Sequence, residues 1–378
     1  MMPPNKSSTQ NPWLHRFAML TALATLALIG IGGLVTSHEA GMSVPDWPSS
    51  YGYNMFLFPF AQWWRVGNVF YEHSHRLFAS GVGLLTTILM VWLWLRESRA
   101  WLRWLGVVAF FAVALQGVLG GLRVVLFKDQ IGIFHATLAQ LFFVLTCAIA
   151  LSTSRWWSGK TESRKQKAES RKLGRLFLFT TILIFLQLLL GATMRHQHAG
   201  LAISDFPLAH GKLWPDTSAD AVARYNQQRM EISGINPITA FQIQLQMAHR
   251  LMAVLILFAV AACAWKAQRW SSRFSVSGAA DNLKVELQPR VIVHLSLVWL
   301  GLIFLQASLG AVTLLWNKPA DIATAHVLVG ALSLATGAML CMISARTLEQ
   351  SGGETRISPA GQKFSRDEIS FAARTSAP

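Results

Sequence analysis

Long runs of apolar residues alternate with short polar segments along most of the chain. Each run approaches or exceeds the roughly 20 residues that a helix needs to cross a hydrocarbon core of about 30 Å. The pattern predicts eight membrane-spanning helices, at about residues 13–35, 72–95, 104–122, 131–151, 176–194, 241–265, 291–315 and 322–345. A transmembrane β-barrel would instead show short segments of alternating polarity. The predicted fold class is an all-α polytopic membrane protein.

The second half of the chain repeats landmarks of the first half. The matched landmarks are the segment 40–48 (AGMSVPDWP) with 199–207 (AGLAISDFP), Gln116 with Gln306, Gly120 with Gly310, and His135 with His326. Each copy contains four predicted spans. Because four is an even number, both copies have the same orientation, which defines a parallel repeat. We therefore expect two tandem four-helix bundles.

The charged residues orient these spans. Only 13% of the residues are charged, and the net charge of +15 comes from Lys and Arg that gather in the terminal segments and in the loops after the even-numbered spans. This positive-inside pattern argues against a nucleic-acid partner. It predicts cytoplasmic termini and long outward loops. We expect the membrane to be a bacterial-type plasma (inner) membrane. The expected divisions are a cytoplasmic N-terminal segment (1–12), the first four-helix unit (13–154), a basic cytoplasmic linker (155–175), the second unit (176–345) and a disordered cytoplasmic tail (346–378).

Four histidines stand near the outward ends of the even-numbered spans. His75 and His135 belong to the first unit, and His249 and His326 occupy the matching positions of the second. Histidine within a membrane span is rare and usually has a partner. Facing helices of a four-helix bundle can ligate a heme iron through two histidines. Zinc or copper is less favoured, because no thiolate or carboxylate cluster has ligand spacing. We predict heme iron as the metal at both pairs.

The two halves differ beside the first histidine of each pair. Glu72 lies three residues before His75, whereas Gln246 holds the equivalent position in the second half. Glu72 could take part in proton chemistry, or it could be a helix-start acid favoured by the macrodipole. Arg76 and Arg250 follow the histidines. They could contact heme propionates or extend to the membrane interface, and the sequence leaves both alternatives open.

Residues 13–345 resemble the heme A synthase family. The resemblance rests on the loop at 40–48, the Glu72/His75-Arg76 stretch, His135, the loop that begins at 195–201 (RHQHAGL), His249-Arg250 and His326. It implies a heme b cofactor on His249 and His326, and the substrate heme O near His75 and His135. It also implies that Glu72 is important for activity. Some bacterial relatives carry a cysteine pair in the outer loops, which this chain lacks.

The family oxidises a methyl group of heme O to the formyl group of heme A, which serves cytochrome oxidase. The implied partners are heme O synthase, cytochrome oxidase assembly factors, an unidentified electron-transfer partner and the lipid bilayer; homo-oligomers remain open. One alternative is a non-enzymatic di-heme electron carrier linked to quinone, which does not require the difference between Glu72 and Gln246. Another is a heme transporter or chaperone, which would favour weak, exposed ligation.

Overall fold

The computed structural model describes residues 11–157, 166–233, 237–275 and 283–349. Over these ranges the protein is helical and has no β-strand. The elements are α1 (Pro12–Ser37), a 3₁₀ turn (Met55–Leu57), α2 (Phe60–Arg65), α3 (Gly67–Arg96), α4 (Ala100–Val125), α5 (Asp129–Thr153), α6 (Gln166–His196), a 3₁₀ turn (Ala199–Leu201), α7 (Ala219–Ser233), α8 (Ala240–Ser275), α9 (Leu283–Leu315) and α10 (Ala320–Glu349). Residues 1–10, 158–165 and 350–378, which include most of the expected N-terminal segment and tail, lie outside the described residues.

Eight helices in the described ranges are long and apolar enough to cross a membrane: α1, α3, α4, α5, α6, α8, α9 and α10. They confirm the prediction of an all-α polytopic membrane protein. Large apolar side chains cover the outside of the molecule; Leu84, Phe111 and Phe258, for example, are 62%, 65% and 69% exposed. Such surfaces suit a lipid solvent, and helices suit it as well because they satisfy their backbone polar groups internally.

The first span shows how local sequence sets a helix boundary. The Asn11 side chain accepts hydrogen bonds from the backbone N–H groups of Trp13 and Leu14, at 3.0 and 3.4 Å. Pro12 follows as the first helical residue, where its missing N–H costs nothing. Together, the side-chain cap and the proline fix the start of α1.

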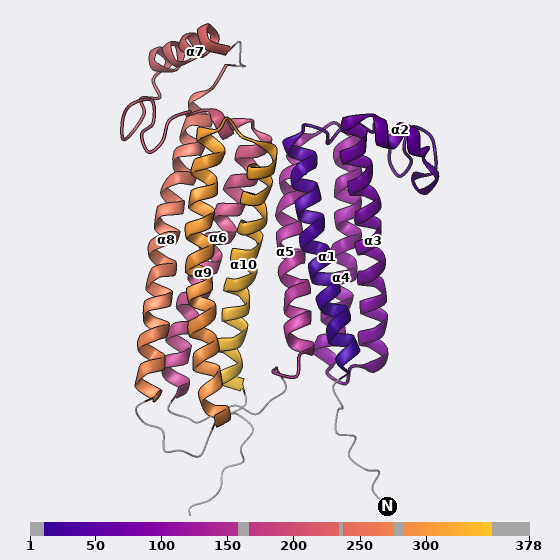
Figure 1. Cartoon of the computed structure of the whole chain (residues 1–378), viewed down its shortest axis with the longest axis vertical. Coiled ribbons are helices and arrows are strands. Elements are labelled where there is room, and N and C mark those ends of the chain that lie inside the picture. Colours follow the sequence, from indigo (N-terminus) through magenta and orange to yellow (C-terminus); the bar gives the residue numbers. More distant parts are fainter. Residues whose placement is uncertain (1–10, 158–165, 234–236, 276–282, 350–378) are drawn as a thin grey trace, which may run out of the picture.

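The eight long helices form two four-helix bundles that stand side by side (Figure 1). In the first bundle the contacting pairs are α1 with α3, α3 with α4, α4 with α5, and α5 with α1. The second bundle has the same ring of contacts among α6, α8, α9 and α10. Because α3 and α5 each contact both α1 and α4, they occupy opposite corners of the first bundle. By the same reasoning, α8 and α10 occupy opposite corners of the second.

The two bundles pack through α1 and α5 on one side and α6 and α10 on the other. A cluster of buried apolar residues fills this contact, formed by Ile29, Phe143, Ala331 and Ala335. Within the second bundle, Trp299 of α9 is fully buried in a cluster with members on all four long helices, and it donates its indole N–H to the Ser333 carbonyl of α10 at 2.8 Å. The bundles therefore form one continuous body within the described residues.

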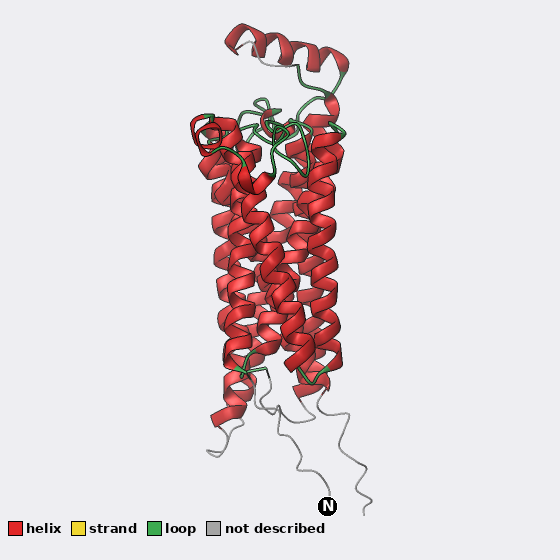
Figure 2. Cartoon of the chain, turned by 90° about the vertical axis from the view of Figure 1, so that its right-hand side faces the viewer, coloured by secondary structure: helices red, strands yellow, loops and turns green. Residues whose placement is uncertain are grey.

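The two long loops gather at one end of the bundles (Figure 2). Each loop turns at a glycine with positive φ, Gly52 at 78° and Gly211 at 75°, a conformation that glycine adopts without steric cost. The first loop also contains α2, and the second contains α7, which lies beyond the ends of the spans (Figure 1). The sequence interpretation expected loops without helices at both places.

Candidate heme sites

The four predicted histidines lie at the loop-bearing end of the bundles. His75 is on α3, His135 on α5, His249 on α8 and His326 on α10, each within about two and a half turns of the start of its helix. All four side chains are partly buried. Each bundle therefore carries two histidines at a similar depth on helices at opposite corners, which is the arrangement that two axial ligands of one heme require.

Each histidine ring packs against a glycine of a neighbouring helix. A Cβ atom added to the glycine would lie close to the imidazole Cε1 atom: 3.1 Å for Gly32 and His75, 3.4 Å for Gly120 and His135, 3.3 Å for Gly191 and His249, and 3.1 Å for Gly310 and His326. These four glycines all lie roughly one and a half turns before the end of their helices. The absence of a side chain therefore lets each ring edge lie against a helix backbone.

The ring nitrogens are compatible with iron ligation. The Nδ1 atoms of His75, His135 and His249 are buried and have no hydrogen-bond partner among the described residues. His326 differs, because its Nδ1 lies 3.1 Å from the Gln306 carbonyl oxygen, to which it can donate. That tautomer leaves Nε2 as the acceptor, the form in which a neutral imidazole binds a metal. The Gln306 amide nitrogen lies 3.3 Å from this Nε2 atom and would have to move for iron to bind there.

Glu72 holds the outer loop of the first half. Its Oε2 atom accepts the backbone N–H of Val44 at 2.8 Å, and its Oε1 atom accepts from Arg76 at 2.7 Å. Gln246 makes the matching bond in the second half, because its Oε1 atom accepts the N–H of Ile203 at 2.7 Å. The side chains of Glu72 and Gln246 thus share one structural task, and only Glu72 adds a negative charge.

The two arginines that follow the histidines also bind loop backbone. Arg76 donates to the carbonyl oxygens of Asp46, Ser49 and Val44 at 2.7, 3.1 and 2.9 Å. Arg250 donates to the carbonyl oxygens of Leu208 and Asp205, both at 2.8 Å. These contacts engage their terminal nitrogens with loop carbonyls, so contact with heme propionates stays a prediction for both residues.

The aspartates of the matched loops shape the turns: Asp46 accepts backbone N–H groups of Tyr51 and Gly52, and Asp205 accepts those of His210 and Gly211. Burial alone would raise the pKa of Asp46, but hydrogen bonds from the Ser49 hydroxyl and from the backbone N–H groups of Gly52 and Tyr51 outweigh it and lower the pKa below its ordinary value. The pKa of Asp205 is lowered in the same way: burial opposes the shift, and the N–H groups of Gly211 and His210 produce it. Both carboxylates therefore stay ionised at neutral pH.

Two further arginines lie at this end of the bundles, and the sequence analysis assigned no role to either. Arg195, at the end of α6, donates to the Gly33 carbonyl at 2.7 Å and to the Ser37 hydroxyl at 2.6 Å, so it joins the second bundle to α1 of the first. Arg123, near the end of α4, packs against Gly41, where an added Cβ would lie 2.7 Å from its Nη1 atom. A positive charge thus stands between the bundles, and another lies beside the first outer loop.

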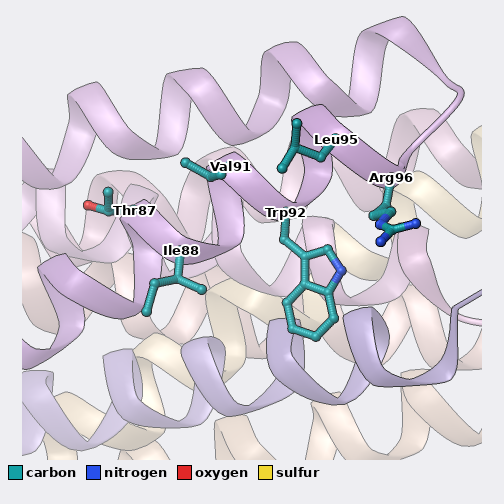
Figure 3. Close-up of a pocket in the computed structure, with 6 residues that line it drawn as sticks. All are labelled: Thr87, Ile88, Val91, Trp92, Leu95 and Arg96. Atoms are coloured by element: carbon teal, nitrogen blue, oxygen red, sulfur yellow. The ribbon is translucent and has the colours of Figure 1, made fainter.

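A groove of about 310 Å³ lies toward the opposite end of α3 (Figure 3). It is lined by Thr87, Ile88, Val91, Trp92, Leu95 and Arg96. Val91 is roughly 24 Å from His75 along the helix axis. This groove is therefore separate from the histidine sites.

A family model described as "cytochrome oxidase assembly protein" matches residues 15–337 of the chain. The chain belongs to the cytochrome oxidase assembly protein family. The matched region begins in α1 and ends in α10, so it contains both bundles and all four histidines. Membership supports an integral membrane protein that handles heme.

Several curated relatives of this chain are named heme A synthase. The protein of Nitrosomonas eutropha is 27% identical over 351 residues, which cover 85% of this chain and 90% of the relative. The protein of Geobacillus kaustophilus is 26% identical, with 88% and 92% covered. The protein of Shouchella clausii is 28% identical over 212 residues, which cover 55% of this chain and 68% of the relative. The similarity therefore extends through most of the membrane portion.

Proposed function

We propose that this protein is a heme A synthase, a membrane oxidoreductase that converts a methyl group of heme O into the formyl group of heme A. The observation that carries the proposal is the set of four histidines whose rings each pack against a glycine of a neighbouring helix. Each bundle contains two of them, at a similar distance from its loop-bearing end. Membership of the cytochrome oxidase assembly protein family, with relatives named heme A synthase, supports the same reaction. A carrier or transporter of heme would not account for those relatives.

The substrate heme O is assigned to the first bundle, with His75 and His135 as its iron ligands. Heme b is assigned to the second bundle, on His249 and His326, where it supplies electron transfer when bound. The argument for this order is Glu72, because a carboxylate can accept a proton at neutral pH and the amide of Gln246 cannot. The half that contains the carboxylate is therefore the half in which chemistry takes place.

Glu72 is the residue proposed to move a proton. Each of its carboxylate oxygens accepts one hydrogen bond, from Val44 or from Arg76, and each has a second lone pair that can take a proton. Arg76 fixes the direction of the carboxylate through a buried ion pair at 2.7 Å. The chain thus keeps a base at a defined position near the His75 turn.

The proposed orientation follows from charge. Arg96, Arg99 and Arg103 lie at the α3–α4 connection, at the end of the bundles where α1 begins, and away from the long loops (Figure 1). The positive-inside rule then assigns this end to the cytoplasm and the histidines to the outer side of a bacterial inner membrane. Heme O synthase and cytochrome oxidase assembly factors would meet the protein in that membrane, along with an electron-transfer partner.

Heme extraction followed by chromatography tests the proposal. The full chain is expressed with a heme O synthase in a host that makes no heme A. Heme A, or a hydroxylated intermediate, should form with this chain and should be absent with the His75→Ala variant or an empty vector. Unchanged heme O in a folded protein that retains heme b, with its electron donor present, would refute the activity.

A further inference from the structure

A glutamine from the neighbouring helix contacts three of the four histidine-bearing turns. The Gln116 amide donates to the His135 carbonyl oxygen at 3.1 Å, the Gln187 amide donates to the His249 carbonyl oxygen at 3.0 Å, and the Gln306 amide nitrogen lies 3.3 Å from His326 Nε2. Within the described residues, no glutamine makes such a contact at His75. The four turns are therefore not equivalent.

The sequence explains the difference. Each of these glutamines lies four residues before the glycine that packs against the histidine ring, as in Gln187 and Gly191. Residues four apart share one face of a helix, a turn apart. In the first span the glycine that packs against the His75 ring is Gly32, and the residue four positions earlier is Leu28. Leu28 packs against the apolar core of the first bundle and has no group that can form a hydrogen bond.

The glutamines offer an acceptor that Leu28 cannot. The Oε1 atoms of Gln116, Gln187 and Gln306 are buried and have no partner within the part of the chain that the structure describes. The Nδ1 atoms of His135 and His249 are also buried and have no partner among the described residues. A metal-bound imidazole usually donates its second N–H to a nearby acceptor, which orients the ring and strengthens the bond to the metal. Rotation of the amide can supply that acceptor beside His135 and His249.

We propose that His75 is the exchangeable iron ligand of the substrate heme. It is exchangeable because Leu28, unlike the glutamines, offers no hydrogen-bond acceptor to the second N–H of the imidazole. The proposal rests on the heme ligation given under the proposed function. Partners of this kind commonly change metal affinity about 10- to 100-fold. The substrate is then held by one supported ligand, His135, and one unsupported ligand, His75. Heme b is held by two supported ligands, His249 beside the Gln187 amide and His326, whose Nδ1 lies 3.1 Å from the Gln306 backbone carbonyl oxygen. A substrate that must enter and leave is matched to the weaker site.

The test compares heme release from three variants of the full chain with release from the unmodified protein. Leu28→Gln adds the missing amide, Leu28→Met keeps the side chain apolar and similar in size, and Gln187→Leu removes an amide from the second bundle. Each protein is co-expressed with a heme O synthase, purified in detergent and mixed with excess apomyoglobin as the heme acceptor. Chromatography then follows the heme b that remains, and separately the heme O together with its oxidised products.

The unmodified protein should lose heme O and its products about 10-fold faster than heme b. Leu28→Gln should slow that loss about 10-fold and raise the low-spin, bis-histidine fraction in the optical and electron paramagnetic resonance spectra, whereas Leu28→Met should do neither. Gln187→Leu should speed heme b loss about 10-fold. If Leu28→Gln keeps heme b but changes neither the release rate nor the low-spin fraction, the proposal is wrong.

Further variants distinguish a failure of the Leu28 proposal from a failure of the proposed heme ligands. If Leu28→Gln fails to fold, Gln187→Leu decides, because unchanged heme b release would show that the amide does not support the ligand. His75→Ala and His249→Ala test the ligand assignment itself. Full retention of both hemes in these two variants would overturn the proposed function's ligand set, whatever Leu28 does.

Discussion

Replacing Glu72 by glutamine separates the structural task of this side chain from its proposed chemical one. The carboxylate accepts the Val44 N–H at 2.8 Å, and Gln246 makes the equivalent bond to Ile203 at 2.7 Å. A glutamine at position 72 should therefore keep the loop bond. The variant removes the charge and leaves the shape of the site.

The expected loss of stability in Glu72→Gln depends on which hydrogen bonds Arg76 keeps. Removing one member of a buried ion pair commonly costs about 3–5 kcal/mol, and the side chains of Arg76 and Glu72 are only 9% and 5% exposed. Arg76 nevertheless keeps its bonds to loop carbonyls, and Arg250 occupies the matching place beside an amide. We therefore expect Glu72→Gln to cost about 1–2 kcal/mol of stability, close to the value of one ordinary hydrogen bond. Glu72→Ala, which loses both bonds, should cost about 3–5 kcal/mol.

Thermal unfolding in detergent and heme chromatography measure the two effects. Glu72→Gln should retain heme b and fold stably, yet form heme A at least about 100-fold more slowly, as expected when a general base is lost. Heme A formation at the unmodified rate would refute a catalytic role for Glu72. A loss of stability equal to that of Glu72→Ala would refute the inference drawn from Gln246.

Three other outcomes are expected. Gly120→Val should displace the His135 ring and lower the heme content of the first bundle as measured by chromatography, whereas Gly117→Val on the same helix, where an added Cβ meets nothing within 4 Å, should leave the heme content unchanged. Arg195→Ala should lower the free energy of unfolding by about 1–3 kcal/mol, because two bonds between the bundles are lost; an unchanged melting temperature would show that these bonds do not stabilise the pair. The folded-state pKa of Asp46 is depressed, so its contribution to stability should be fully present above about pH 5 and lost as the pH falls below about 4. Melting temperatures measured across this range should show a smaller acid loss for Asp46→Asn, and an identical loss would contradict the assignment.

The sequence predicted the spans because a hydrocarbon solvent leaves a strong apolar signal. It predicted their ends less well: α3 begins at Gly67 rather than near residue 72, because the helical hydrogen bonding extends through residues 67–71, ahead of the long apolar run. The α7 helix was missed for a related reason. Its sequence is mostly polar, and it is anchored by specific contacts, such as the two hydrogen bonds between Asn226 and the backbone of Ile238.

The histidine positions were visible as matched landmarks, but their surroundings were only partly visible. Gln116 and Gly120 could be matched to the seventh span from the sequence. The same spacing at Gln187 and Gly191 could have been noticed, and it would have drawn attention to Leu28. The cross-bundle bond of Arg195 could not have been found in this way, because it depends on how the two bundles are placed against each other.

The contact between the bundles has a consequence for symmetry. When helices are matched by their order in each bundle, α1 corresponds to α6 and α5 to α10. The contacts of α1 with α10 and of α5 with α6 are then equivalent helix pairings, and α5 with α10 is a helix that contacts its own counterpart. That is the pattern of an isologous interface about a two-fold axis. A single four-helix unit would thus possess a surface complementary to itself, and the covalent connection between the halves would preserve a pairing that two separate copies could form.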